Sequence, residues 1–165
     1  EVPSNFTTFY KNNKEKEKIK ESKIKFNNKI LHQSKLLNYF LNKTSLPKIE
    51  KETNDLLRKI KKNKKYSFSK KDIMMIESLK SDGVKISKKY NKLYEYKSSL
   101  PSEINSFIVN EETGLVLLKL VEIIGKHEVE DLDIESISFV VRIMNELKII
   151  NLRNEILLKV LPLKV

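Results

Sequence analysis

Apolar residues along this chain recur at helical spacing, and no segment shows sustained alternation between apolar and polar positions. Spacings of three and four residues are typical of amphipathic α-helices, whereas strict alternation is typical of half-buried strands. The chain has only three Gly and four Pro, so interruptions of the pattern are few. The pattern predicts an all-α fold.

Caps and stops place the expected helices. Pro47 suits a first helical turn and predicts a helix that runs to about residue 62. Ser69 followed three residues later by Asp72 resembles a capping box, and Gly83 is a typical stop, so a helix is expected over 69–81. Asp133 is a good N-cap for a later helix. The remaining expected helices are 85–97, 111–125, 134–148 and 151–161.

The core is expected mainly in the second half of the chain. The 134–148 helix has one apolar stripe and further apolar residues beside it, which is typical of a helix buried between neighbours. The stripe consists of Ile137, Val140, Val141, Met144 and Leu147, and the additional residues are Ile134, Phe139 and Ile143. Earlier, residues 30–42 are amphipathic, and the helix after Pro47 is expected to turn Ile49, Leu56, Leu57 and Ile60 inward.

The same pattern divides the chain into three parts. Residues 1–29 are nearly all Lys, Glu and Asn after an aromatic start, so we expect a basic extended or disordered arm that orders only against a partner. Residues 30–65 form a basic helical segment. Residues 66–165 are expected to form a helical-repeat domain, in which short antiparallel hairpins stack as an α-solenoid-like array.

A weak internal repeat supports this array. Residues 68–76 (FSKKDIMMI) and 132–140 (LDIESISFV) each read as an apolar anchor, a cap and a buried stripe, and they lie 64 positions apart. Half of that spacing is close to the period of helical-hairpin repeats. An ordinary helical bundle with an accidental pseudo-repeat is the alternative.

The stretch 131–163 (DLDIESISFVVRIMNELKIINLRNEILLKVLPL) resembles a repeat of the FAST-kinase-like and RAP-domain proteins. The resemblance covers about residues 66–165 and implies an organellar RNA-handling protein built from degenerate helical hairpins. No RAP domain is visible in the sequence. The resemblance therefore carries over neither a nuclease-like role nor base-reading positions.

Charge is split unevenly along the chain. Residues 1–100 carry 26 Lys or Arg against 11 Asp or Glu, whereas residues 101–165 carry 7 against 11. The whole chain has a formal net charge of +11. This split favours a polyanion-binding half joined to an apolar, mildly acidic packing module.

The strongest candidate for RNA contact is a basic cluster in which no acidic residue interrupts positions 56–71. Lysine neutralises phosphates, and an aromatic residue offers a face on which a base can stack. Because nearly all the cations are Lys, the cluster favours backbone contact over base reading. A solvated charged turn is the alternative. The predicted RNA-binding residues are Arg58, Lys59, Lys61, Lys62, Lys64, Lys65, Tyr66, Lys70 and Lys71.

Other chemistry is sparse. The sequence has no Cys, which excludes disulfides, thiolate nucleophiles and Cys-based metal sites within it. His32 and His127 fit no ligand or triad pattern, and the acidic run over 128–135 reads as a helix start better than as a calcium loop. Tyr90 and Tyr94 share a helix face and are expected to pack. With no phosphate loop or nucleophile motif, we predict a non-enzyme without cofactor or metal.

The favoured hypothesis is an RNA-binding helical-repeat protein that serves as a structural subunit of a large ribonucleoprotein, such as an organellar (mitochondrial) ribosome. The basic half would contact RNA, expected to be rRNA, through the RNA backbone, and the acidic, apolar C-terminal half would contact neighbouring proteins. A cytoplasmic location remains open. A helical scaffold without RNA contact and a protein of anionic membrane surfaces are the alternatives. No membrane span is expected, because the apolar run 114–125 is short and is broken by Lys119 and Glu122.

Overall fold

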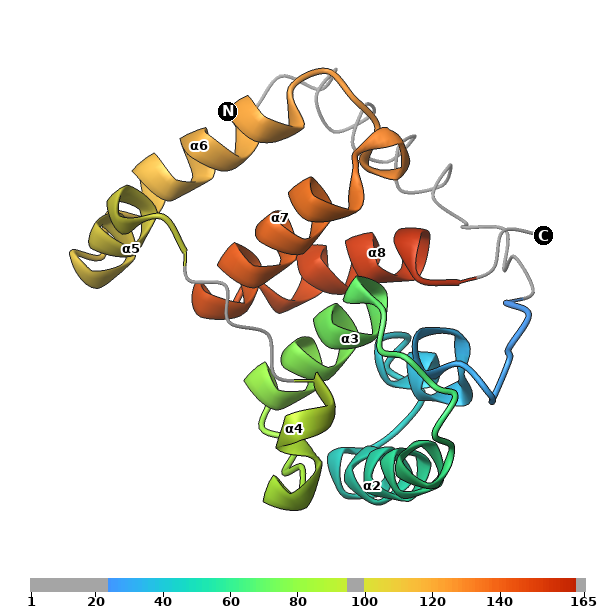
Figure 1. Cartoon of the computed structure of the whole chain (residues 1–165). Helices are drawn as coiled ribbons and strands as arrows, with labels where there is room; N and C mark the ends of the chain where they lie inside the picture. The colour runs from blue at the N-terminus through green and yellow to red at the C-terminus, as the bar shows by residue number, and fades with distance from the viewer. Residues whose placement is uncertain (1–23, 95–99, 163–165) are drawn as a thin grey trace, which may run out of the picture.

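The computed structural model describes residues 24–94 and 100–162, and all regular secondary structure among them is helical, with no strand (Figure 1). The all-α prediction is therefore confirmed for these residues. Most of the expected arm, residues 1–23, lies outside the described residues. The α-helices are α2 (Leu46–Lys62), α3 (Lys70–Ser81), α4 (Asn91–Tyr94), α5 (Ser102–Val109), α6 (Thr113–Ile124), α7 (Ile134–Glu146) and α8 (Ile150–Val160).

The local signals for helix starts act as expected. Pro47 lies in the first turn of α2, where its missing N–H needs no helical partner. The Ser69 side chain accepts from the Asp72 N–H while the Asp72 side chain accepts from the Ser69 N–H, which completes the predicted capping box of α3. At α7 the Asp133 side chain accepts from the Ser136 N–H. Gly83, just after α3, has φ +92°, a conformation that favours glycine.

The prediction of one helix over 85–97 is wrong. Residues 84–87 are irregular, a 3-10 turn (η3) spans Lys88–Tyr90, and α4 covers only Asn91–Tyr94 before the chain leaves the described residues. Side chains of α2 explain the difference. Glu50 accepts from the Lys85 N–H (2.9 Å), and Asn54 accepts from the Ser87 N–H (3.0 Å) and donates to the Lys85 carbonyl (3.0 Å). These bonds satisfy backbone groups that would otherwise favour a helix.

The amphipathic stretch 30–42 forms two 3-10 turns, η1 (Leu31–Gln33) and η2 (Lys35–Tyr39). Ser34 separates them, because its hydroxyl donates to the Leu31 carbonyl (2.7 Å) and accepts from the Leu36 N–H (3.3 Å). Their apolar residues belong to the same core cluster as the C-terminal helices. Residues on both sides of position 66 thus share one core.

Helix α3 lies at the centre of that core and packs most extensively against α7, which also packs on α8 (Figure 1). The predicted α7 stripe is confirmed at four of its five positions, since Ile137, Val140, Val141 and Met144 are buried and Leu147 is half-buried. Of the additional residues, Ile143 is buried, and Ile134 and Phe139 are half-buried. The α5–α6 pair lies at the opposite end of the molecule from α2 (Figure 1).

A fully buried arginine near the start of α8 contacts the C-terminal ends of α3 and α7. Arg153 of α8 has no exposed surface, and its guanidinium donates to both carboxylate oxygens of Asp82 at the end of α3, at 2.8 and 2.6 Å. It also donates to the side-chain carbonyl oxygens of Asn145 (3.0 Å) and Asn154 (2.7 Å). The ring of Phe40 lies 6.0 Å from the guanidinium carbon. Bidentate geometry with additional acceptors is what makes a buried charge tolerable.

We predict that Asp82→Asn destabilises the fold by about 3–5 kcal/mol, because it leaves a buried, uncompensated guanidinium. The double variant Arg153→Met/Asp82→Asn should lose less than the sum of the two single variants. The measurement is urea unfolding of all four proteins at neutral pH.

An exposed pair in the same chain provides the control. Arg58 and Asp55 form an i,i+3 ion pair with side chains 61% and 45% exposed. Arg58→Met with Asp55→Asn should therefore change the unfolding free energy by less than about 1 kcal/mol. Additive losses in the buried cycle would contradict the coupling that we assign to Arg153 and Asp82.

Candidate nucleic-acid interface

The C-terminal part of α2 carries the first half of the candidate interface. Arg58, Lys59, Lys61 and Lys62 are exposed on α2, and Lys64 and Lys65 are exposed in the turn that follows. The helix ends at Asn63, whose N–H donates to the Ile60 carbonyl at 2.8 Å. Cations in a last helical turn interact favourably with the helix dipole, an effect worth about 0.3–1 kcal/mol. That effect accounts for a few lysines here, but not for those beyond the helix end.

The connection after α3 brings a second basic run beside the first. No acidic residue occurs between positions 83 and 94, and Lys85, Lys88, Lys89 and Lys92 are exposed there. The hydrogen bonds from Glu50 and Asn54 to Lys85 and Ser87 hold this connection against α2. Two lysine runs that are separate in the sequence therefore meet on one surface.

Tyr90 is the point of contact between the runs. Its side chain is buried, and the ammonium groups of Lys61 and Lys89 lie 5.9 and 5.0 Å from the centre of its ring. Lys61 also reaches the Lys89 carbonyl at 3.4 Å. The aliphatic parts of lysines can cover an aromatic ring while their charged ends stay in water. The predicted packing role of Tyr90 is confirmed, and Tyr94 is likewise buried.

Lys70 and Lys71 differ from the rest of the predicted cluster because their side chains bond to other helices of the protein. Both are half-buried at the start of α3. Lys70 forms an ion pair with Glu135 of α7, and Lys71 donates to the Val160 carbonyl at the end of α8 (2.7 Å). These contacts join α3 to α7 and α8. We use the name lysine face for the exposed basic residues of 58–65 and 85–92. This definition excludes Lys70 and Lys71.

Tyr66 is also engaged inside the protein. Its hydroxyl donates to Asp72 Oδ2 (3.0 Å) and accepts from the Leu31 N–H (2.9 Å), and its ring lies edge-on to Phe68 at 5.3 Å between centroids. Burial raises the pKa of Tyr66. The hydrogen bond from the Leu31 N–H lowers this pKa, and the neighbouring Asp72 carboxylate raises it. These contacts account for the position of Tyr66 without a stacked base.

Asp72 and His32 form a buried polar pair beside Tyr66. His32 Nδ1 lies 2.6 Å from Asp72 Oδ1, and the backbone N–H of His32 donates to the same oxygen (2.9 Å). Ser69 Oγ approaches the same ring nitrogen at 3.3 Å. A relay from serine through histidine to a carboxylate uses both ring nitrogens, so this arrangement fits fold stabilisation and does not resemble a catalytic triad. His127 is exposed after α6.

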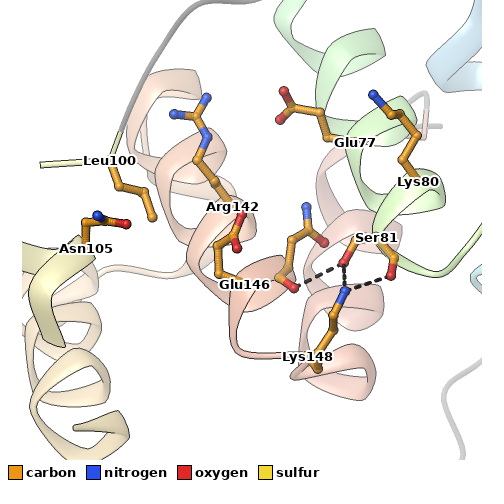
Figure 2. Close-up of a pocket in the computed structure, with 9 residues that line it drawn as sticks. Glu77, Lys80, Ser81, Leu100, Asn105, Arg142, Glu146 and Lys148 are labelled. Atoms are coloured by element: carbon orange, nitrogen blue, oxygen red, sulfur yellow. Dashed lines mark hydrogen bonds between the residues drawn. The ribbon is translucent and has the colours of Figure 1, made fainter. Parts of the chain in front are cut away.

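A cleft of mixed charge is lined by residues of α3, α7 and α5 (Figure 2). It has a volume of about 640 Å³, and Glu77 and Lys80 of α3 face Arg142 and Glu146 of α7 across it. Burial raises the pKa of Glu77, while Arg142 and Lys80 act against the shift. Lys148 closes one end by donating to the Ser81 carbonyl and hydroxyl at 2.9 and 3.0 Å. With both signs of charge present, this cleft does not favour a polyanion.

The described residues contain no group of three or more His, Cys, Asp or Glu placed to hold a metal ion. None of their helices combines the length and apolar character that crossing a bilayer requires. No protein-family model, curated protein or solved structure matches the chain.

Sequence reasoning missed two parts of this surface. It did not place the lysines around Tyr90 beside α2, because the residues that connect them, Glu50 and Asn54, lie about 31–35 positions away. It also gave no sign that Lys70 pairs with Glu135, because Glu135 lies 65 positions further on. The acid-free run over 83–94 is a signal that the sequence does contain.

We predict that Asp72→Asn destabilises the protein at neutral pH by at least about 2 kcal/mol, because hydrogen bonds to a charged carboxylate are lost. Burial alone would raise the pKa of Asp72, but hydrogen bonds from His32 and from the Ser69 and His32 N–H groups lower it overall. A lowered folded-state pKa stabilises the fold above the unfolded pKa, and that contribution is lost as pH falls through the folded pKa. The stability gap to the parent should therefore shrink below about pH 4.

Urea unfolding of both proteins from pH 7 downward is the measurement. Leu57→Ala is the control, because it removes a buried side chain without changing a titratable group. Its stability gap should stay constant over the pH range in which the Asp72→Asn gap closes. A constant Asp72→Asn gap would show that the carboxylate is not stabilised in its charged form.

Proposed function

We propose that this chain is an RNA-binding helical protein that contacts the phosphate backbone through the lysine face and serves as a structural subunit of a large ribonucleoprotein. The observation that carries the proposal is the meeting of two acid-free lysine runs around Tyr90. Clustered like charges repel one another, and a polyanion relieves that repulsion while releasing its condensed counterions. Lysine favours backbone contact over base reading.

The finer parts of the proposal come from the sequence. The resemblance of residues 131–163 to repeats of FAST-kinase-like and RAP-domain proteins supports an organellar setting, with a mitochondrial ribosome as the main example and a cytoplasmic particle as the alternative. It also supports hairpins stacked as an α-solenoid-like array. The adjacent packing of α3 with α7 and of α7 with α8 is compatible with such an array. The proposed role is non-enzymatic.

We predict that RNA affinity falls steeply with salt and that the lysine face sets the slope. The test variant Lys64→Gln/Lys65→Gln/Lys88→Gln/Lys92→Gln removes up to four phosphate contacts from exposed positions of both runs. If all four bind, the log–log salt slope for single-stranded RNA should flatten by about 3, at roughly 0.7 per contact. The measurement is a titration of oligouridine at several salt concentrations. Replacing oligouridine by oligoadenosine should change the affinity little.

Two half-variants and one control sharpen this test. Lys64→Gln/Lys65→Gln and Lys88→Gln/Lys92→Gln should each flatten the slope by about 1.4. Lys126→Gln/Lys159→Gln removes two positive charges, as each half-variant does, but from exposed positions of the acidic half, and should leave the slope unchanged. An effect from only one run would contradict a joint surface. Equal slopes for the parent and the four-lysine variant would show a solvated face and favour the scaffold function without RNA.

A membrane-surface role is the other outcome to separate. Vesicles of phosphatidylcholine with phosphatidylserine offer negative charge without the geometry of a nucleic acid. Co-sedimentation with these vesicles should be weak at a salt concentration at which oligouridine still binds. Stronger binding to the vesicles than to RNA would contradict the proposal.

A further inference from the structure

Helix α6 is apolar on two faces, and only one of them is buried. Val116 and Leu120 face the core, with Ile123 and Ile124 half-buried beside them. On the other side, Leu118 and Val121 are 66% and 65% exposed, and Leu115 and Leu117 are exposed as well. Helices that are apolar all round are normally buried between neighbours. This face therefore lacks a neighbour among the described residues.

The exposed residues form a continuous stripe. At about 100° per residue, Leu117, Val121, Gly114 and Leu118 follow one another around the helix and span an arc of about 100°, the width of a typical core-facing stripe. No charged residue lies within that arc. A Cβ added at Gly114 would meet nothing within 4 Å, so the stripe is open there also. We call these four residues the α6 stripe; Leu115 is also exposed, but it lies outside this arc, beyond Glu122.

Acidic residues flank the α6 stripe at its N-terminal end and along one side. Residues 101–131, which contain the α5–α6 pair, carry seven Asp or Glu against two Lys. Glu111 and Glu112 are exposed just before α6. Glu122 lies beside the stripe and is paired with Lys119 at 3.2 Å. A locally negative rim on a chain of net charge +11 is complementary to a positively charged partner.

We propose that the α6 stripe binds a basic amphipathic helix of another protein. An apolar groove or face rimmed by charge is the usual receptor for an amphipathic helix of opposite charge. A second copy that pairs through the same face would place its acidic rim against the first, which is unfavourable. The lysine face of a second copy is no substitute, because none of the exposed large apolar residues among the described residues lies in it. This inference does not depend on RNA binding.

The test uses two synthetic peptides. Both carry the same leucine stripe at helical spacing, one with lysines and the other with glutamates on the polar face, and both are labelled for fluorescence anisotropy. The lysine peptide should bind the full chain although the peptide and the protein both carry net positive charge, because the acidic rim attracts the peptide locally. The glutamate peptide should bind at least about tenfold more weakly. Equal binding of the two peptides would overturn the assignment of a basic partner.

Variants locate the site. Leu118→Gln/Val121→Gln should weaken binding of the lysine peptide about tenfold or more, since burying each aliphatic side chain contributes about a decade of affinity. Ile150→Gln/Leu152→Gln alters two exposed apolar residues of α8 and should leave the affinity within about twofold. Both variants change exposed positions, and thermal melting checks that they fold like the parent. Equal effects of the two variants, or none, would overturn the placement on α6.

Sedimentation velocity distinguishes the remaining occupant. The parent chain should stay monomeric over the concentrations used in the peptide titration. Self-association that Leu118→Gln/Val121→Gln abolishes would show that a second copy covers the stripe, and would overturn the proposal.

Discussion

The pair of Arg153 and Asp82 is the interaction on which the arrangement of the helices depends. Desolvating a guanidinium and a carboxylate is expensive, and the cost is recovered only when geometry and additional hydrogen bonds are nearly complete. Here the guanidinium reaches Asp82 twice and also reaches Asn145 and Asn154. The Asp82 carboxylate in turn accepts a hydrogen bond from Tyr39, whose pKa is raised first by burial and then by Asp82. The ends of α3, α7 and α8 and the 3-10 turn η2 are thereby fixed relative to one another.

Helix α3 connects the buried Arg153–Asp82 pair to the two basic runs on the surface. Its C-terminal end is held by Arg153, and its N-terminal end is held by Asp72 with His32 and Tyr66. The two basic runs of the lysine face lie immediately before and after α3 in the sequence. Because both ends of α3 are fixed, the positions at which the two runs connect to α3 are fixed as well. Hydrogen bonds to Glu50 and Asn54 of α2 then hold the second run beside the first. The α5–α6 pair lies at the opposite end and offers an acidic, apolar surface (Figure 1).

The parts of this structure that the sequence could predict are local. The capping box of Ser69 and Asp72 and the Asp133 cap involve residues three apart, so their chemistry is visible in a short window. The irregular backbone at the start of the second basic run could not be predicted, because Asn54 and Glu50 of another helix accept hydrogen bonds from its N–H groups. Burial of Arg153 was missed because arginine is normally exposed. One signal existed, since Arg153 shares helical spacing with buried Ile156, Leu157 and Val160.

In the arrangement that we propose, one helical core presents a lysine face for RNA at one end and the α6 stripe for a protein partner at the other. Mapping backbone amide shifts of the ¹⁵N-labelled chain during titration with oligouridine tests it most directly. We expect chemical-shift changes concentrated in residues 58–65 and 85–92, with the amides of 113–124 unmoved. Changes concentrated on α6, or spread evenly over all helices, would contradict it.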